Sequence, residues 1–144
     1  MSDFLIDWFK WFEEGISSLD QKSKEKFFSN CGANCVKRGL IESFRNHYIE
    51  CNNDLDQFIL RLSEIGHTVG QVLVPTHKYE IAYPSCSCEL HKMGYINTDS
   101  ICECSRQSII HVLSTLKPES EIKVEILATI LSGDKECRFE ILVD

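Results

Sequence analysis

The sequence contains no long apolar run and no concentration of positive charge. No stretch approaches the roughly 18 consecutive apolar residues that read as a transmembrane helix. The 22 acidic residues outnumber the 15 basic ones, giving a formal net charge of -7. Nucleic acids and anionic membrane surfaces are bound by clustered Lys and Arg, which this chain does not show. We therefore expect no nucleic acid and no membrane among its partners.

Two further absences bear on the eight cysteines. The N-terminus lacks the basic and apolar segments of a signal peptide, so we expect a cytoplasmic protein, in which thiols stay reduced and structural disulfides are uncommon. No Cys-x-x-Cys follows a strand as in thioredoxin, and no Ser-His-Asp or Cys-His-acid order is specific enough to indicate catalysis. Metal binding and redox chemistry are the functions that cysteines in this compartment favour, and whether the chain is an enzyme stays open.

Length and hydrophobic periodicity define the fold class. A chain of 144 residues with 43% hydrophobic and 26% charged content fits one domain spanning residues 1–144. Residues 1–66 show helical spacing, whereas residues 67–144 alternate, then turn helical, then alternate again, which indicates a mixed β-α-β-β part. The sequence predicts an α+β fold. About four N-terminal helices pack with an antiparallel sheet, one helix follows in the C-terminal half, and a β-hairpin closes the chain.

The first predicted helix, over residues 2–15, carries a dense aromatic stripe. Its apolar side presents Phe4, Leu5, Trp8, Phe9, Trp11 and Phe12, and its polar side is net acidic. Helices that lie in a membrane interface usually carry Lys and Arg on the polar side. We therefore expect this helix to dock on the core or on a second copy of the chain, so that a homodimer through it is one interpretation.

Capping patterns at Ser18 and Asp54 predict the starts of two further helices. Gly32 inside the first of them costs about 1 kcal/mol of helix stability relative to Ala, which predicts that another part of the protein approaches the helix backbone closely there. Cys31 and Cys35 are four residues apart, so their sulfurs lie on one helical face, where they can share a metal, form a redox couple or simply pack. His47 and Cys51 have the same spacing, although packing residues at that spacing are far commoner than ligands.

The C-terminal half predicts two short strands, a helix and a hairpin. The strands cover 72–74 and 79–83, the helix begins near Ser105 and ends before Pro118, and the hairpin joins residues 122–130 to residues 137–143. A register with Ile130 opposite Cys137 and Val124 opposite Val143 places the apolar residues of both strands on one face. Cys137 is then predicted on the core face, at the turn end of the sheet.

Four cysteines fall within the nineteen residues from Cys86 to Cys104, as two Cys-x-Cys pairs with a histidine between them. Thiolates are good zinc ligands, although zinc knuckles usually place two residues between paired cysteines. The sequence predicts a metal site drawn from Cys86, Cys88, Cys102, Cys104 and Cys137, with Cys31, Cys35, His91 and Glu125 as additional candidate ligands or redox groups. A redox site at the start of the following helix is the alternative, because the helix dipole favours thiolates there.

Residues 83–143 resemble the 4-vinyl reductase type of domain. The resemblance rests on the two cysteine pairs and on the hairpin Gly133-Asp-Lys-Glu-Cys137-Arg-Phe139. It implies a small-molecule pocket between helices and sheet, a zinc site near it, with iron as the other metal to consider, and Cys102 or Cys104 with Cys137 as ligands beside Glu125. Where sensor members of this group carry a further cysteine, this chain has Ala128-Thr129-Ile130.

The same hairpin is similar to that of the L-2-amino-thiazoline-4-carboxylic acid hydrolase-like proteins, which are small bacterial chains. This second resemblance implies an enzyme in which a cysteine or a metal-bound water attacks a cyclic, imine-like carbon. A ligand-binding domain, a hydrolase and a thiol-redox protein that uses Cys31 and Cys35 are therefore the three functions to weigh.

Overall fold

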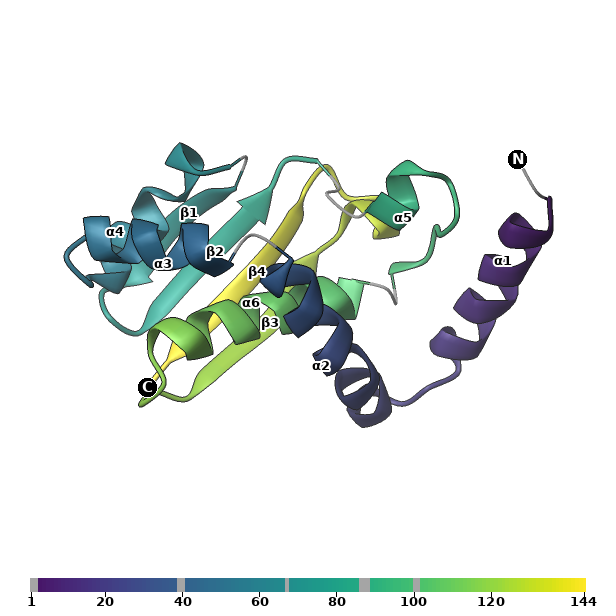
Figure 1. Ribbon diagram of the computed structural model, residues 1–144, viewed down its shortest axis with the longest axis horizontal. Helices are drawn as coiled ribbons and strands as arrows, with labels where there is room; N and C mark the ends of the chain where they lie inside the picture. The colour runs from purple at the N-terminus through teal and green to yellow at the C-terminus, as the bar shows by residue number, and fades with distance from the viewer. Residues whose placement is uncertain (1–2, 39–40, 67, 86–88, 100–101) are drawn as a thin grey trace.

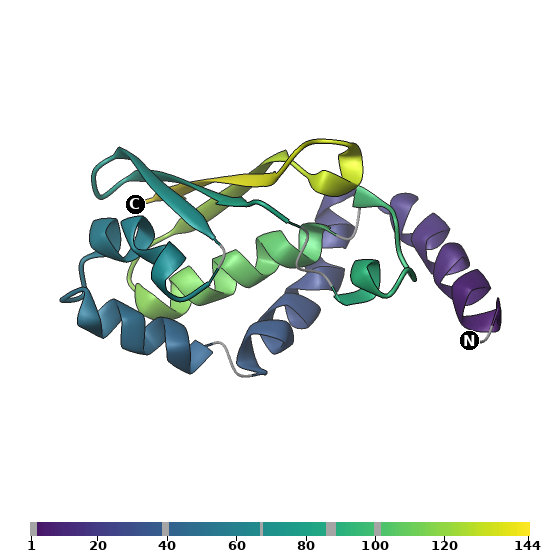
Figure 2. The same ribbon diagram turned by 90° about the horizontal axis from the view of Figure 1, so that it is seen from above.

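A computed structural model describes residues 3–38, 41–66, 68–85, 89–99 and 102–144. It has two layers, a four-stranded antiparallel sheet and a layer of helices on one face of that sheet (Figures 1 and 2), which confirms the predicted α+β class. The order of elements is α1 (Asp3–Ser17), α2 (Gln21–Lys37), α3 (Ile41–Glu50), α4 (Leu55–Leu60), η1 (Leu62–Glu64), β1 (Val69–Val74), β2 (Lys78–Tyr83), α5 (Glu89–Lys92), α6 (Cys102–Leu116), β3 (Ile122–Ala128), η3 (Ile130–Ser132) and β4 (Cys137–Val143). Among the described residues, no helix has the length and apolar character needed to cross a membrane.

One of the two predicted helix starts is correct. Asp54 caps α4 by accepting hydrogen bonds from the amides of Asp56 and Gln57. The predicted start at Ser18 is wrong, because Asp20 caps α2 by accepting from the Ser23 amide at 2.7 Å. The Ser18 hydroxyl instead donates to the Gly15 carbonyl at 2.6 Å and so closes the end of α1.

The strands lie in the order β1-β2-β4-β3, so β4 is central and β3 is an edge. The predicted register of the closing hairpin is wrong by two residues, since Val124 pairs with Ile141 and Ile126 with Phe139. The chain uses Ile130–Ser132 for a 3-10 turn that ends at Gly133 in the left-handed region (φ 98°), and a bulge follows Ile126. Up to the bulge, an even shift keeps each side chain on its predicted face. Cys137 is buried in the core and still lies on the helix-covered face.

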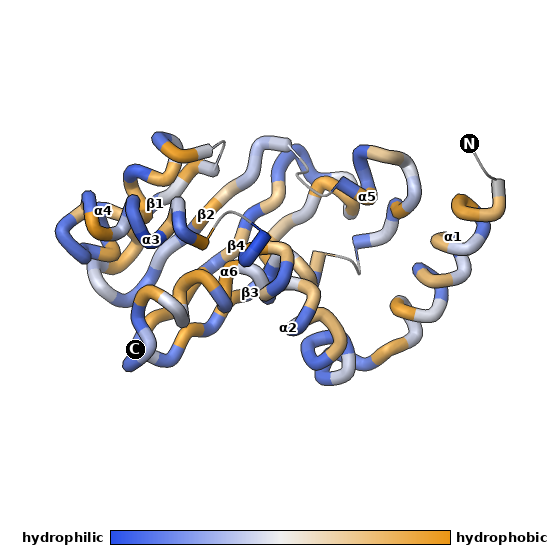
Figure 3. The backbone as a smooth tube through the Cα atoms, in the orientation of Figure 1, coloured by the Kyte–Doolittle hydropathy of each residue, from blue (hydrophilic) through white to orange (hydrophobic). Residues whose placement is uncertain are grey.

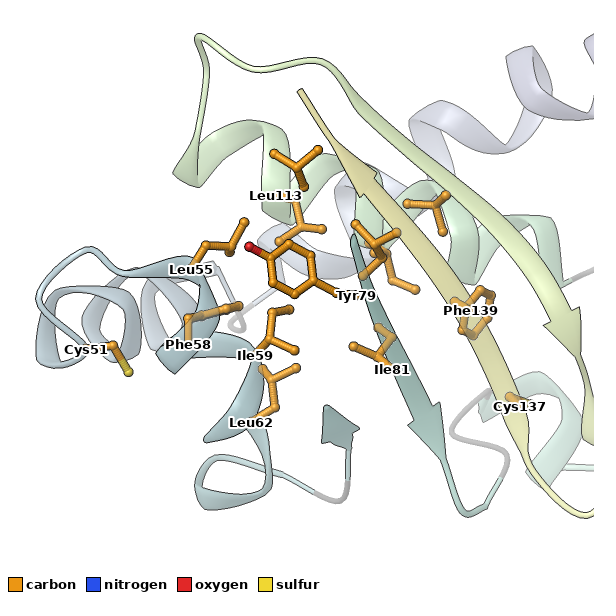
Figure 4. Close-up of a cluster of buried hydrophobic side chains, with 14 residues drawn as sticks. Cys51, Leu55, Phe58, Ile59, Leu62, Tyr79, Ile81, Leu113, Cys137 and Phe139 are labelled. Atoms are coloured by element: carbon orange, nitrogen blue, oxygen red, sulfur yellow. The ribbon is translucent and has the colours of Figure 1, made fainter. Parts of the chain in front are cut away.

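The core lies between this face of the sheet and the helices (Figure 4). Tyr79 and Phe139 from the sheet pack with Phe58 and Ile59 from α4 and with Leu113 from α6, and each is at most 3% exposed. In the described part of the chain no element covers the opposite face of the sheet (Figure 2), where Arg138 pairs with Glu80 at 2.7 Å.

Two glycines permit close approaches that set the helices in place. A Cβ at Gly32 would lie 2.8 Å from the Ser108 amide nitrogen and 2.9 Å from the Cys104 carbonyl, so α2 crosses α6 backbone to backbone. This confirms the contact that the sequence predicts at Gly32. A Cβ at Gly70 would lie 1.9 Å from the Ile59 carbonyl oxygen, so β1 runs directly under α4.

Candidate functional site

Cys137 opens β4 on the helix-covered face of the sheet, where it is 7% exposed. The backbone amide of Ile130 donates a hydrogen bond to its sulfur at 3.3 Å. A donor directed at sulfur stabilises the thiolate relative to the thiol. The hairpin turn of η3 supplies this donor, and the turn is therefore part of the site.

Tyr83 is the strand partner of Cys137 in β2, and its ring stands edge-on to Phe139 at 5.8 Å. Burial raises the pKa of Tyr83 to about 12, and negative charge on Cys137 adds to the shift. Tyr83 is also the third residue before Cys86 in the sequence. Strand β2 therefore ends beside Cys137, three residues before the cysteine-rich stretch begins in the sequence.

Cys102 and Cys104 lie in the first turn of α6, because this helix begins three residues earlier than the predicted start at Ser105. Cys102 is 7% exposed and packs in a small cluster with Ile16, Phe28 and Ile96. The N-terminal turn of a 15-residue helix carries partial positive charge, which favours a thiolate over a thiol. Burial among apolar side chains favours the thiol instead, so the two effects on Cys102 oppose each other.

The η3 turn links Cys137 to the cluster around Cys102. Ile130 packs against the sheet core that contains Cys137, and its neighbour Leu131 packs against the cluster that contains Cys102 and, at its edge, Cys104. The two cysteines therefore lie on the same side of the sheet, Cys137 on its helix-covered face and Cys102 in the layer of helices. A shared site requires at least that both lie on one side.

His91, a predicted additional ligand, lies in α5 with Nδ1 3.2 Å from the Ile96 carbonyl oxygen. Such a contact fixes Nδ1 as the protonated nitrogen and presents Nε2 as the acceptor, the tautomer that metal-binding histidines commonly adopt. Ile96 itself packs with Cys102. This contact ties His91 to Ile96, which is a packing neighbour of Cys102.

The other predicted ligands lie elsewhere. Glu125 pairs with Glu140 in the sheet register and so belongs to the open face, opposite Cys137. Cys31 and Cys35 are exposed on α2, whereas Cys102 is buried. In residues 3–38, 41–66, 68–85, 89–99 and 102–144 no three His, Cys, Asp or Glu side chains converge to hold a metal ion, and Cys86 and Cys88 lie outside these ranges.

A buried polar cluster beside the site could not be read from the sequence. The Glu103 carboxylate, 3% exposed, accepts from Arg106 at 2.8 Å, from Gln107 at 2.8 Å and from Gln21 at 2.9 Å. Arg106 also donates to Glu25 at 2.9 Å and to a β3 carbonyl at 2.8 Å. The cluster therefore joins α2, α6 and β3 in the turn of α6 that carries Cys102 and Cys104.

A hollow of about 320 Å³ lies beside this cluster, at the edge of β3. Its size is at the lower end of the range for small-molecule sites. Arg106 lines it, but that guanidinium already contacts two carboxylates and a backbone carbonyl. The hollow is therefore poorly suited to bind an anion through Arg106.

His47 and Cys51 do meet, as their spacing allows. The His47 Nε2 atom lies 4.0 Å from the Cys51 sulfur, and the Arg61 guanidinium donates to that sulfur at 3.7 Å. Both residues are 2% exposed, and Phe58 packs against the imidazole. The pair is buried beside the core between the sheet and the helices, which agrees with the packing role that is commoner for residues at this spacing.

The raised pKa of Tyr83 predicts how stability changes at alkaline pH. An unfolded tyrosine ionises near pH 10, whereas Tyr83 in the folded protein ionises near pH 12, so the unfolded state releases its proton first. Tyr83 should therefore contribute a fall of roughly 1–3 kcal/mol in the free energy of unfolding as pH rises from 10 to 12, beside the contribution of Tyr79, whose pKa burial also raises. Urea unfolding at a series of pH values should show a shallower fall for Tyr83→Phe, and an identical fall would contradict this assignment.

No protein-family model matches the sequence, and no curated protein is significantly similar to it.

Proposed function

We propose that this chain is a small-molecule-binding domain of the 4-vinyl reductase type whose cysteines hold a metal ion, with zinc as the first choice. The observation that carries the proposal is the environment of Cys137. This buried sulfur accepts a backbone amide at 3.3 Å, and amide donors of this kind compensate the charge of a metal-bound thiolate.

Cys102 supplies the second ligand of the proposed centre. It is buried at the positive end of α6 and lies on the same side of the sheet as Cys137. His91, which contacts Ile96 of the Cys102 cluster, is proposed as the third ligand. Cys86, Cys88 and Cys104 are the remaining candidate ligands for a tetrahedral site of thiolates with or without one imidazole.

Thiolate sulfur is a soft ligand, so these residues favour a soft or borderline metal ion. Zinc and iron accept thiolates, whereas magnesium and calcium prefer carboxylate, carbonyl and water oxygens. Glu125 is not proposed as a ligand, because it lies with Glu140 on the open face of the sheet. The centre therefore depends on sulfur, and its occupancy should fall at acidic pH, when thiolates are protonated.

Cobalt substitution tests the proposal directly. Protein freed of metal under reducing conditions is titrated with Co²⁺, which reports sulfur ligands through charge-transfer absorption. The expected result is saturation near one equivalent, with this absorption strongly reduced in Cys137→Ser and Cys102→Ser and unchanged in Cys31→Ser/Cys35→Ser. No thiolate absorption in the wild-type protein, or the same absorption in all variants, would overturn the proposal.

A further inference from the structure

Helix α1 leaves half of its aromatic stripe uncovered. Its inner edge is docked, since Ile16 is 4% exposed and the Phe9 ring stacks on Tyr95 at 5.1 Å. The helix lies at one end of the molecule, apart from the layer that covers the sheet (Figure 1), and alternates between strongly apolar and polar positions (Figure 3). Its outer edge, with Phe4, Trp8 and Trp11, remains 44–61% exposed.

The exposed aromatics continue from α1 onto α2. Phe12 packs against Trp8 with ring centroids 5.6 Å apart and against Phe27 of α2 at 6.2 Å. Phe27 is itself 45% exposed. We call the set Phe4, Trp8, Trp11 and Phe27 the aromatic surface; contiguous exposed apolar surface of this kind usually marks an interaction site.

The two helices that form the aromatic surface carry opposite charges. Helix α1 contains four acidic residues and one lysine, whereas the first two turns of α2 contain Lys22, Lys24 and Lys26 with one glutamate. That glutamate, Glu25, is already paired with Arg106 at 2.9 Å. The aromatic surface therefore has an acidic flank and a basic flank.

This charge distribution decides between the classes of partner. An anionic membrane would be repelled by α1, and a basic protein segment would be repelled by the lysines of α2. A two-fold axis, in contrast, places the same surface on both partners, so that α1 of one copy meets α2 of the other twice. A surface that carries both signs is complementary to itself under that operation.

We propose that the aromatic surface binds a second copy of this chain, with α1 of each protomer laid on the start of α2 of the other. Each buried aromatic side chain covers about 150–250 Å². Four rings that are about half exposed then offer roughly 400 Å² per copy, against about 800 Å² in a standard interface. The dimer is consequently weak, with a dissociation constant on the order of 10 µM.

Sedimentation of two charge-reversed variants tests this arrangement. One variant reverses the acidic flank (Asp7→Lys/Glu14→Lys), and the other reverses the basic flank (Lys22→Glu/Lys26→Glu). Each variant alone places like charges across both α1–α2 contacts, so its dimer should weaken by about tenfold or more. An equimolar mixture restores opposite charges at both contacts and should dimerise with an affinity close to that of the wild-type protein.

Two controls distinguish this dimer from association driven by net charge alone or by a different surface. Lys37→Glu/Arg38→Glu changes the net charge as Lys22→Glu/Lys26→Glu does, but at the far end of α2, and should leave the dimer affinity unchanged. Trp11→Ala removes part of the aromatic surface and should weaken the dimer by about tenfold. Circular dichroism establishes that each variant is folded. The proposal is overturned if the wild-type protein stays monomeric at concentrations several times the expected dissociation constant. It is also overturned if either charge-reversed variant dimerises like the wild-type protein, or if the equimolar mixture does not recover the dimer affinity.

Discussion

Replacing Arg106 with Met should lower the free energy of unfolding by about 3 kcal/mol or more, because it leaves a buried carboxylate without its cation. Glu103 is 3% exposed and takes two hydrogen bonds from Arg106, at 2.8 and 3.0 Å. The same change also removes the bonds from Arg106 to Glu25 and to the Val124 carbonyl. Urea unfolding at pH 7 measures the loss.

The chain supplies a matched control for this prediction. Glu42 and Arg45 have the same i, i+3 spacing and a 2.7 Å contact, but their side chains are 69% and 50% exposed. Arg45→Met should therefore cost less than about 1 kcal/mol, as exposed ion pairs do. Replacing both partners, as Glu103→Gln/Arg106→Met, should cost less than Arg106→Met alone, since no buried charge is then left unpaired. Equal losses at Arg106 and Arg45 would contradict the role of burial.

Gly70→Ala should destabilise the protein by about 3 kcal/mol, at the upper end of the range for overpacking. The added Cβ would meet the Ile59 carbonyl oxygen at 1.9 Å and the Ile59 Cγ2 at 2.8 Å. The obstacle is backbone, which no change of rotamer can relieve, so β1 and α4 must separate. Thermal unfolding followed by circular dichroism would show the loss as a lower Tm.

Gly15 is the matched control for Gly70. It lies inside α1, and a Cβ there has nothing within 4 Å. Gly15→Ala should therefore raise stability by about 0.5–1 kcal/mol through the higher helix propensity of alanine. If Gly70→Ala were as harmless as Gly15→Ala, the close contact between β1 and α4 would be wrong.

Local patterns in the sequence were sufficient to predict the fold class. The spacing of apolar residues separates the helices of residues 1–66 from the alternating strands that follow, because those periods are set by which face is buried. The isolated Gly32 correctly indicated a close backbone contact, since a glycine inside a helix has a cost that packing can offset. The sequence therefore predicts features that depend on which face of a helix or strand is buried, and on a single glycine within a helix.

Features that depend on turn geometry or on distant partners could not be predicted in this way. The hairpin register differs by two residues because η3 and the left-handed Gly133 take up chain length that a simple four-residue loop does not. Glu103 and Arg106 look like an ordinary surface pair at i, i+3, and only the positions of Gln21 and Glu25 on α2 show that the pair is buried. Long-range packing, which no local pattern encodes, decides both cases.

The positions of the individual site residues were predicted in part. Residue type and hairpin alternation correctly placed Cys137 on the core face, whereas the pairing of Cys102 or Cys104 with it, which the resemblance implies, stays a prediction. Glu125 lies between Val124 and Ile126 in β3, so alternation along the strand places its side chain on the open face, away from Cys137. The amide that donates to Cys137 depends on the η3 turn, which no local pattern in the sequence predicts.

The metal content of the purified protein decides whether the cysteines form a metal centre. Protein isolated without chelator under reducing conditions is analysed for zinc and iron, beside Cys137→Ser and Cys31→Ser/Cys35→Ser prepared in the same way. We expect about one metal ion per chain in the wild-type protein and in the exposed-cysteine variant, and a large loss in Cys137→Ser. A wild-type protein without metal that also takes up none on reconstitution, or a Cys137→Ser variant that keeps a full equivalent, would contradict the proposed centre.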